Sequence, residues 1–225
     1  MTSTTMTSSW EFTKKRSIYH FDKWRMDPRW DAVVGLGRIA GDWEDELDAA
    51  IESSVPGTWA NRGYKGEGVV SPDLAAEEYD LIKAGADPKM NIAHFVWKMT
   101  PKFQKITDLF ALEDPFSRIH IQRTGEVFTM HIDKLQKWNP EHPETVFRCA
   151  IHLNDWEPGQ WWQSGNYTHT KWRAGDIFTF DWMNLPHGTA NASLLPRATL
   201  LLTGNATEQT HKFLAELKKV NEYQI

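Results

Sequence analysis

Apolar and polar positions follow two different patterns along the chain, and the change comes near residue 115. Before it, apolar residues recur at helical spacing in three segments, Asp42 to about Ser53, Ser71 to Ala84 and about Lys102 to Leu112. After it, short runs with strand character are separated by turn signals such as Thr124-Gly125 and Gly175-Asp176. A last helix is predicted from Thr207 to about Glu222. The pattern therefore predicts a mainly β protein with flanking helices.

The predicted strands cover residues 117–124, 126–133, 145–153, 160–172, 176–182, 187–193 and 197–204. Several short strands of this kind are typical of a sandwich or barrel, and the jelly roll is the version that holds a metal inside its mouth. We therefore expect one domain over residues 10–225, with a helical support region (10–115), a double-stranded β-helix (jelly roll, cupin-like) core (116–205) and a C-terminal helix (206–225). The helices should pack outside one sheet. Residues 1–9, rich in Ser and Thr, are predicted to be a flexible tail.

Composition limits the function and the location of the protein. The formal net charge of -5 and a pI near 6.0 give no broad cationic surface, so we expect no nucleic-acid partner. Cys149 is the single cysteine, which excludes an internal disulfide and fits a reducing cytoplasm. No run approaches the roughly 18 consecutive apolar residues of a membrane helix. We expect a soluble cytoplasmic protein, and its oligomeric state is open.

Two histidines, a carboxylate and an arginine stand in an informative order in the second half. His131 and Asp133 are two apart on a predicted strand, which places both on one face about 6.6 to 6.8 Å apart, and His187 begins a later strand. Two imidazoles and one carboxylate are the ligand set that holds ferrous iron on one face and leaves the other open. Arg197, ten residues after His187, offers a fixed fork to the far carboxylate of a keto acid, and Thr199 shares its face. We expect Arg197 to begin the antiparallel neighbour of the His187 strand.

Spacing alone is a weak signal, as a second pair in the same chain shows. His20 and Asp22 have the same H-x-D spacing as His131 and Asp133 but lie outside the strand region and have no evident later partner. Taken alone, either pair reads as surface residues. The ordered set of a strand pair, later strands, a histidine and an arginine makes the second pair the candidate metal site.

At this point four segments resemble a known family: Arg148–Leu153 (RCAIHL), Gly175–Asp181 (GDIFTFD), His187–Asn191 (HGTAN) and Arg197. They are similar to the Fe(II)- and 2-oxoglutarate-dependent oxygenases with a double-stranded β-helix core, and within them to the aspartyl/asparaginyl β-hydroxylase and proline hydroxylase group. The resemblance covers roughly residues 116–205 and does not extend into the helical first half.

The resemblance implies a reaction and a role for individual residues. Fe(II) would be bound by His131, Asp133 and His187, and 2-oxoglutarate would pair with Arg197. His152 matches a position that contacts the cosubstrate, and Arg148 matches a basic residue nearby; a satisfied core histidine and an edge ion pair are their simpler interpretations. The implied enzyme is a dioxygenase that consumes O2 and 2-oxoglutarate, releases succinate and CO2, and hydroxylates an unactivated C–H bond.

Two positions narrow the resemblance. A Gly or Ala in place of Asp133 would indicate a halogenase, so the carboxylate favours hydroxylation. Nucleic-acid demethylases of the superfamily carry a second arginine six residues after the first, where this chain has Thr203, and this argues against alkylation repair.

Tryptophan is abundant, at 12 of 225 residues, and suits both a core and a pocket for an apolar or cationic group. Candidate substrate contacts are Gln122, Trp156, Trp161 and Trp182, and the loop from Lys134 to Glu144 is a natural lid. The substrate is expected to be an amino acid, a peptide or another small molecule. Two alternatives stay open: a cupin-like metal enzyme that does not use 2-oxoglutarate, in which Arg197 would bind substrate, and a non-catalytic jelly-roll module that binds sugar or peptide.

Overall fold

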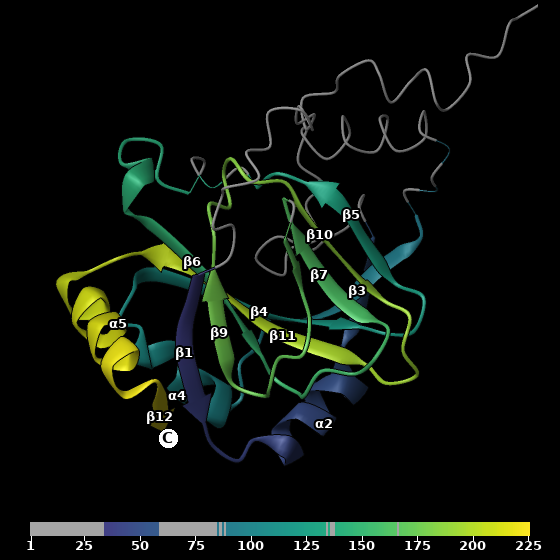
Figure 1. Cartoon of the computed structure of the whole chain (residues 1–225), viewed down its shortest axis with the longest axis horizontal. Helices are drawn as coiled ribbons and strands as arrows, with labels where there is room; N and C mark the ends of the chain where they lie inside the picture. Colours follow the sequence, from purple (N-terminus) through teal and green to yellow (C-terminus); the bar gives the residue numbers. More distant parts are fainter. Residues whose placement is uncertain are drawn as a thin grey trace, which may run out of the picture.

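The computed structural model of the chain describes residues 34–58, 85, 87, 89–133, 135, 138–165 and 167–225 (Figure 1). Its strands are β1 (Val34–Ala40), β2 (Val55–Thr58), β3 (Asn91–Val96), β4 (Glu113–Gln122), β5 (Val127–His131), β6 (Val146–His152), β7 (Gln160–Ser164), β8 (Tyr167–His169), β9 (Asp176–Thr179), β10 (His187–Asn191), β11 (Arg197–Asn205) and β12 (Glu222–Gln224). Its helices are α2 (Glu44–Ser53), α4 (Pro101–Leu109) and α5 (Glu208–Val220), with a 3-10 turn at Pro143–Thr145.

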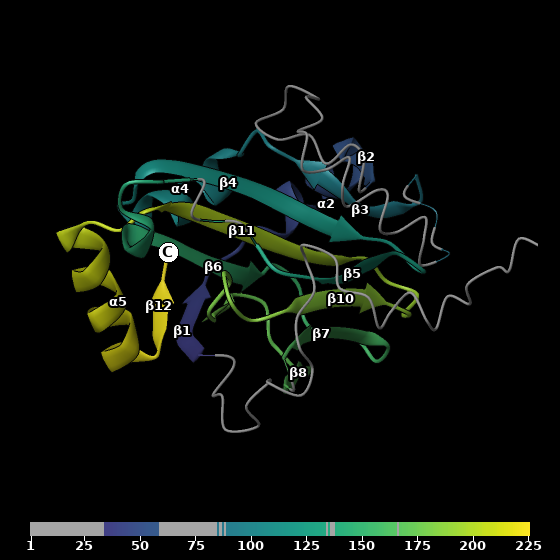
Figure 2. The ribbon, with the colours of Figure 1, turned by 90° about the horizontal axis from the view of Figure 1, so that it is seen from above.

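The strands of this described part form two sheets. The larger has the order β12-β1-β9-β6-β11-β4-β3-β2, and the smaller has the order β5-β10-β7-β8. Figure 2 shows β4, β11 and β6 in one layer and β10 and β7 in the other. All pairings are antiparallel except that of β1 with β12. This is a two-sheet jelly-roll arrangement, so the predicted fold class is confirmed.

The helices cover one face of the larger sheet, as predicted. Each helix has a terminus that its sequence favours: three acidic residues open α2, Pro101 opens α4, and Thr207 caps α5 by accepting from the Thr210 amide at 3.2 Å. Their apolar sides join alternate residues of β4, β6 and β11 in one core, whose members include Leu47, Phe103, Ile106, Phe213, Leu217, Ile119, Ile121, Ile151, Leu200 and Leu202. Burial of this continuous apolar surface is the main stabilising contribution.

The opposite face of the larger sheet looks toward the smaller sheet and carries many polar residues. On β11, Arg197, Thr199, Leu201 and Thr203 alternate with the helix-side residues, and Leu201 packs in a second cluster with Trp162 of β7. Period-two alternation thus puts apolar residues under the helices and polar ones between the sheets. This interior contains the candidate site.

Two predictions about the fold were wrong. Residues 10–115 are not a purely helical support, because β1, β2 and β3 lie in this region and belong to the larger sheet. β1 contains Gly35 and Gly37 and β2 contains Pro56 and Gly57, whereas β1 and β3 are held by pairing with distant segments, β9 and β4 respectively. Local sequence pattern does not report such long-range pairing.

The second error concerns the strands of His187 and Arg197, which are not neighbours. β10 lies between β5 and β7 in the smaller sheet, whereas β11 lies between β6 and β4 in the larger one. With both its edges paired, β10 has no place for β11, and the chain crosses between the sheets at residues 192–196. In this crossover, the Asn191 side-chain amide and the Ser193 hydroxyl both donate to Leu195 O, at 2.8 and 2.9 Å.

Some predictions lie outside the described residues. These are the tail at 1–9, the His20/Asp22 pair and the helix from Ser71 to Ala84. None of the helices in the described ranges has the length and apolar character needed to span a bilayer.

Candidate metal centre

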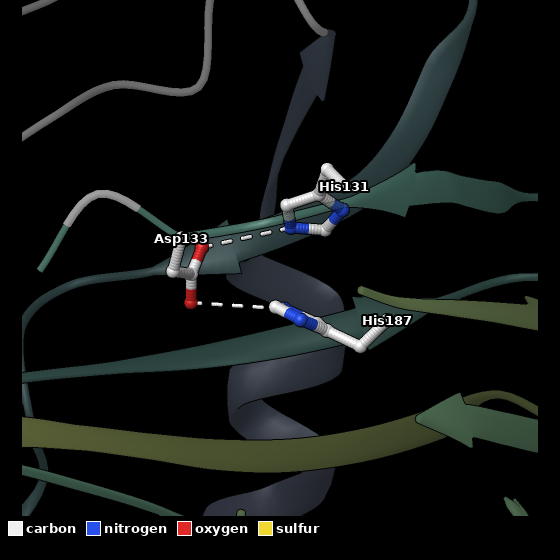
Figure 3. A group of neighbouring side chains, drawn as sticks. All are labelled: His131, Asp133 and His187. Atoms are coloured by element: carbon white, nitrogen blue, oxygen red, sulfur yellow. Dashed lines mark ion pairs between the residues drawn. The ribbon is translucent and has the colours of Figure 1, made fainter. Parts of the chain in front are cut away.

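His131, Asp133 and His187 come together where β5 and β10 meet. His131 ends β5 and is paired directly opposite His187, the first residue of β10. Asp133 lies just beyond the strand, where its amide donates to Trp182 O at 3.0 Å. Its carboxylate lies 3.6 Å from Nε2 of each histidine, and the three ligand atoms lie within 4.8 Å of one another (Figure 3). Small side-chain adjustments would bring all three onto one cation at about 2.0–2.2 Å.

Both imidazoles are held in the orientation that a metal requires. Nδ1 of His131 donates to Thr129 O at 2.8 Å, and Nδ1 of His187 donates to Leu185 O at 3.2 Å. With the proton on Nδ1, the lone pair of each ring is on Nε2, which faces Asp133. Burial lowers the pKa of His187, although the nearby Asp133 carboxylate acts in the opposite direction. The ring is therefore neutral at pH 7 and able to bind a metal.

Asp133 is ionised because a cation lies beside it. Burial alone would raise its pKa, but the basic groups around the carboxylate, the Arg148 guanidinium foremost, outweigh burial and hold the pKa well below its ordinary value. Nη1 of Arg148 contacts Asp133 Oδ2, and Nε of Arg148 donates to Thr203 Oγ at 2.7 Å. Arg148 is thus a buried partner of Asp133, and its predicted contact with a cosubstrate stays a prediction.

Arg197 lies across the interior on β11 and is 1% exposed. Its Nε and Nη2 donate to Gln122 Oε1, and its guanidinium carbon lies 5.3 Å from the centre of the Trp162 ring. Nη1 has no hydrogen-bond partner among the described residues. Burial lowers the pKa of Arg197 to about 9, so the group is still charged at pH 7. A buried guanidinium with an unpartnered N–H group, and with no carboxylate of the described residues in contact, is chemically suited to bind an anionic ligand.

A polar row beside Arg197 has the same incomplete hydrogen bonding. Thr199 of β11 is paired with His120 of β4 on one side and with His152 of β6 on the other. Thr199 Oγ, His120 Nε2 and both ring nitrogens of His152 are buried without a hydrogen-bond partner in the residues described. Burial, followed by neighbouring cations, lowers the pKa of both histidines well below the ordinary value, so both are neutral. Such atoms call for a polar ligand or water.

His152 is also packed among aromatic rings. It stacks on Trp172 with ring centres 4.0 Å apart and planes 4° apart, and lies 5.0 Å from Phe178 and 5.2 Å from His169. A cavity of about 280 Å³ lies between β1, β8 and β9 and is lined in part by His169 and Phe178. None of the three candidate metal ligands lines this cavity.

The predicted substrate contacts are dispersed. Gln122 is fully buried beside Arg197, and Trp182 lies beside His187 with ring centres 5.1 Å apart. Trp156 lies in the loop between β6 and β7, where its ring nitrogen donates to Gln160 O at 2.7 Å. Trp161 is 38% exposed on the outer face of the smaller sheet, whereas the adjacent Trp162 is 4% exposed and points inward.

The structure brings three further residues, Trp162, His169 and Ser164, into the interior. The sequence pattern placed Trp162 in a segment that could contact substrate, but it gave no supporting context for His169 and no signal for Ser164. Trp162 lies near both Arg197 and His187, and its register partner on β8 is His169. Ser164 is paired with His187, and its buried hydroxyl has no partner among the described residues. The alternation of side chains along β7 could have predicted the position of Ser164. If Trp162 points inward, Ser164, two residues later, must also point inward, and Trp161 must point outward. Of the predicted lid loop, Leu135 is buried against the second cluster, and no closing movement follows from this contact.

Comparison with known proteins finds similar solved structures but no matching family. No family model matches the chain, and no curated protein sequence does. Similar solved structures include the non-haem α-ketoglutarate-dependent epimerase SnoN from nogalamycin biosynthesis, with 13% identity over 83% of this chain and 84% of that chain and a TM-score of 0.49. A Pseudomonas putida prolyl-4-hydroxylase has 17% identity over 60% of this chain and 85% of its own, with a TM-score of 0.41. A Cupin 2 conserved barrel domain protein from Salinispora arenicola has 10% identity over 55% and 84%, with a TM-score of 0.32. These values assign no reaction to this chain.

Proposed function

We propose that the protein is a Fe(II)- and 2-oxoglutarate-dependent dioxygenase that hydroxylates an unactivated C–H bond of an amino acid, a peptide or another small molecule. The observation that carries this proposal is the combination, within one interior, of the His131/Asp133/His187 cluster and the buried, incompletely bonded Arg197. A metal alone would explain the cluster. It would not explain a buried cation whose Nη1, like the neighbouring Thr199 hydroxyl, has no hydrogen-bond partner in the described part of the chain.

The donor set fits ferrous iron. Two neutral imidazoles and one carboxylate bind on one face of the ion and leave positions for a keto acid and O2. When bound, iron and 2-oxoglutarate supply an oxidant at the expense of O2, with succinate and CO2 as coproducts. The task of the protein is then to orient the reactants and exclude water.

Individual residues have distinct parts in that task. Arg197 and Thr199 would hold the distal carboxylate of 2-oxoglutarate, which fixes the keto acid relative to the metal. Arg148 and Thr203 hold Asp133 in position from behind. Phe180, Trp162 and Trp182 surround His187, with ring centres 4.9, 6.4 and 5.1 Å away, and keep its side of the centre dry.

The proposal extends to the partners. The substrate would be small and the protein would act without nucleic acid, which the acidic composition supports. A succinate-coupled screen of amino acids and peptides, followed by mass spectrometry for the gain of one oxygen atom, would identify the substrate class.

The first test of the proposal is spectroscopic and needs no substrate. Anaerobic addition of Fe(II) and 2-oxoglutarate should give a weak visible charge-transfer band, and His187→Ala should remove it. His211→Ala, on the exposed side of α5, is the matched control and should keep the band. If the wild-type protein binds Fe(II) but gives no band and forms no succinate under O2, the cupin-like alternative without 2-oxoglutarate replaces the proposal. A protein that binds neither metal nor keto acid would instead be a binding module.

A further inference from the structure

Gln122 is the residue that determines how Arg197 presents its charge. It ends β4, is fully buried, and is paired in register with Arg197 of β11. Its side-chain amide donates to Ile92 O at 2.9 Å and more weakly to Glu126 O at 3.4 Å. Because two carbonyls fix the nitrogen side of the amide, the oxygen must face Arg197.

The Gln122 oxygen occupies one edge of the guanidinium. Oε1 accepts from Nε of Arg197 at 3.1 Å, from Nη2 of Arg197, and from the Thr189 hydroxyl at 2.9 Å. The opposite amine, Nη1, has no partner among the residues described. A planar guanidinium bound along its Nε/Nη2 edge has the Nη1/Nη2 edge left for a bidentate carboxylate.

The neutrality of Gln122 matters as much as its position. Its oxygen satisfies two N–H groups of Arg197 but brings no negative charge, so the buried cation keeps its attraction for an external anion. A carboxylate at this position would be an internal counter-ion and would compete with any anionic ligand.

We propose that Gln122 is a positioning and specificity residue that fixes Arg197 by a neutral contact and thereby reserves its charge for a dicarboxylic cosubstrate. The identity of the cosubstrate rests on the proposed function. The role of Gln122 rests on the contacts to Arg197, Ile92 and Thr189. The proposal predicts that Gln122 sets the preference for a ligand with a distal carboxylate over one without it.

The experiment measures this preference by calorimetry on the Mn²⁺-loaded protein. The two titrants are 2-oxoglutarate and 2-oxopentanoate, which has the same chain length but a methyl group in place of the distal carboxylate. The wild-type protein should prefer 2-oxoglutarate by on the order of 100-fold, because the analogue leaves a buried cation unpaired. Gln122→Glu should reduce this preference to about 10-fold or less, with little change in affinity for 2-oxopentanoate.

A second variant separates charge from shape. Gln122→Met removes the acceptor but adds no charge, so Arg197 keeps its attraction, and the preference should fall by only about 3-fold, to about 30-fold, through loss of orientation. Ser193→Ala, which removes a buried hydroxyl that touches neither Gln122 nor Arg197, should keep the wild-type preference. Thermal unfolding of each Mn²⁺-loaded variant measures its stability. Comparison with the affinity ratio then shows whether the loss of preference results from the added charge or from a less stable protein.

The outcomes are distinguishable. A wild-type protein without a preference for 2-oxoglutarate overturns the proposed function and the cosubstrate assigned to Arg197. A wild-type preference that Gln122→Glu retains overturns the role of Gln122 alone. Equal weakening of both ligands in proportion to lost stability also overturns it, because that pattern belongs to a purely structural residue.

Discussion

Arg148 and Asp133 form a largely buried ion pair in which the carboxylate is also a candidate metal ligand. Nη1 of Arg148 contacts the same carboxylate oxygen, Oδ2, that lies 3.6 Å from Nε2 of His187. Arg148 is itself fixed by Thr203 through a bond of 2.7 Å, and its guanidinium lies 5.7 Å from the Trp182 ring centre. The pair therefore fixes the orientation of the carboxylate and keeps it ionised before any metal arrives.

Removal of Arg148 should weaken metal binding. In Arg148→Met, burial of Asp133 is no longer outweighed by its strongest cation, so its pKa rises and protons compete with the metal. The carboxylate also loses its fixed orientation. We expect Mn²⁺ affinity at pH 7 to fall about 10- to 100-fold, measured by calorimetry. Thr203→Val, which removes only the support of Arg148, should have a smaller effect, and tighter binding in Arg148→Met would show that the cation opposes the metal.

Metal binding should stabilise the fold through the three ligands. Mn²⁺ at about 100 times its dissociation constant should add about 3 kcal/mol to the free energy of unfolding, because the unfolded chain does not assemble the site. Asp133→Ala and His187→Ala should each abolish the corresponding rise in Tm, measured by scanning calorimetry with and without metal. His211→Ala should keep it. A rise that persists in both ligand variants would place the metal elsewhere.

The sequence pattern anticipated the part of the fold that local alternation determines. Most strands after residue 115 and the terminal helix were predicted to within a few residues, because their apolar faces repeat at a clear period. The run 160–172, predicted as one strand, is instead the antiparallel pair β7 and β8. β1, β2 and β3 were missed because their pairing partners are distant in sequence. The sheet to which β11 belongs was missed for a related reason: a short connection can either turn back within a sheet or cross between sheets.

In the candidate site too, the features set by local sequence pattern were predicted and those set by long-range contacts were not. The order of His131, Asp133, His187 and Arg197 pointed to one interior, and the structure brings the first three together. The partner of Asp133 could not be predicted, because Arg148 of β6 reaches it through the folding of the chain and not through spacing along the sequence. Arg148 also donates to Thr203, its register partner on β11, so a guanidinium lies beside Thr203. That the protein does not act on nucleic acids stays a prediction.

His152 should make the protein sensitive to acid. Its pKa is lowered by burial and then by His169 and Arg197, whereas in the unfolded chain it titrates near 6.5. Below pH 6.5 the unfolded state takes up a proton that the folded state does not, so stability falls as pH falls, by about 1 kcal/mol per pH unit for one such group. His152→Phe keeps the stacking on Trp172 and should flatten this dependence in urea unfolding between about pH 5 and 6.5. An unchanged slope in His152→Phe would contradict the assignment.

Gly175 and Gly125 provide a matched test of how tightly β1 is held against the turn before β9. Both have a left-handed backbone, with φ of +87° and +86°, so alanine is strained to the same degree at either position. A Cβ at Gly175 would lie 1.8 Å from Ile39 O, whereas one at Gly125 would meet nothing within 4 Å. The Gly175 amide also donates to His152 O at 2.7 Å, and its carbonyl accepts from the Ile39 amide at 3.0 Å.

The two alanine variants should therefore differ in stability by more than backbone strain can explain. Gly125→Ala should cost about 1–2 kcal/mol of unfolding free energy, the strain of the left-handed backbone alone. Gly175→Ala should cost about 3–5 kcal/mol, because β1 must also move away from the turn and disturb the backbone that carries His152. Urea unfolding of the two variants measures the difference. Equal costs would mean that β1 moves aside freely and does not support the polar row beside Arg197.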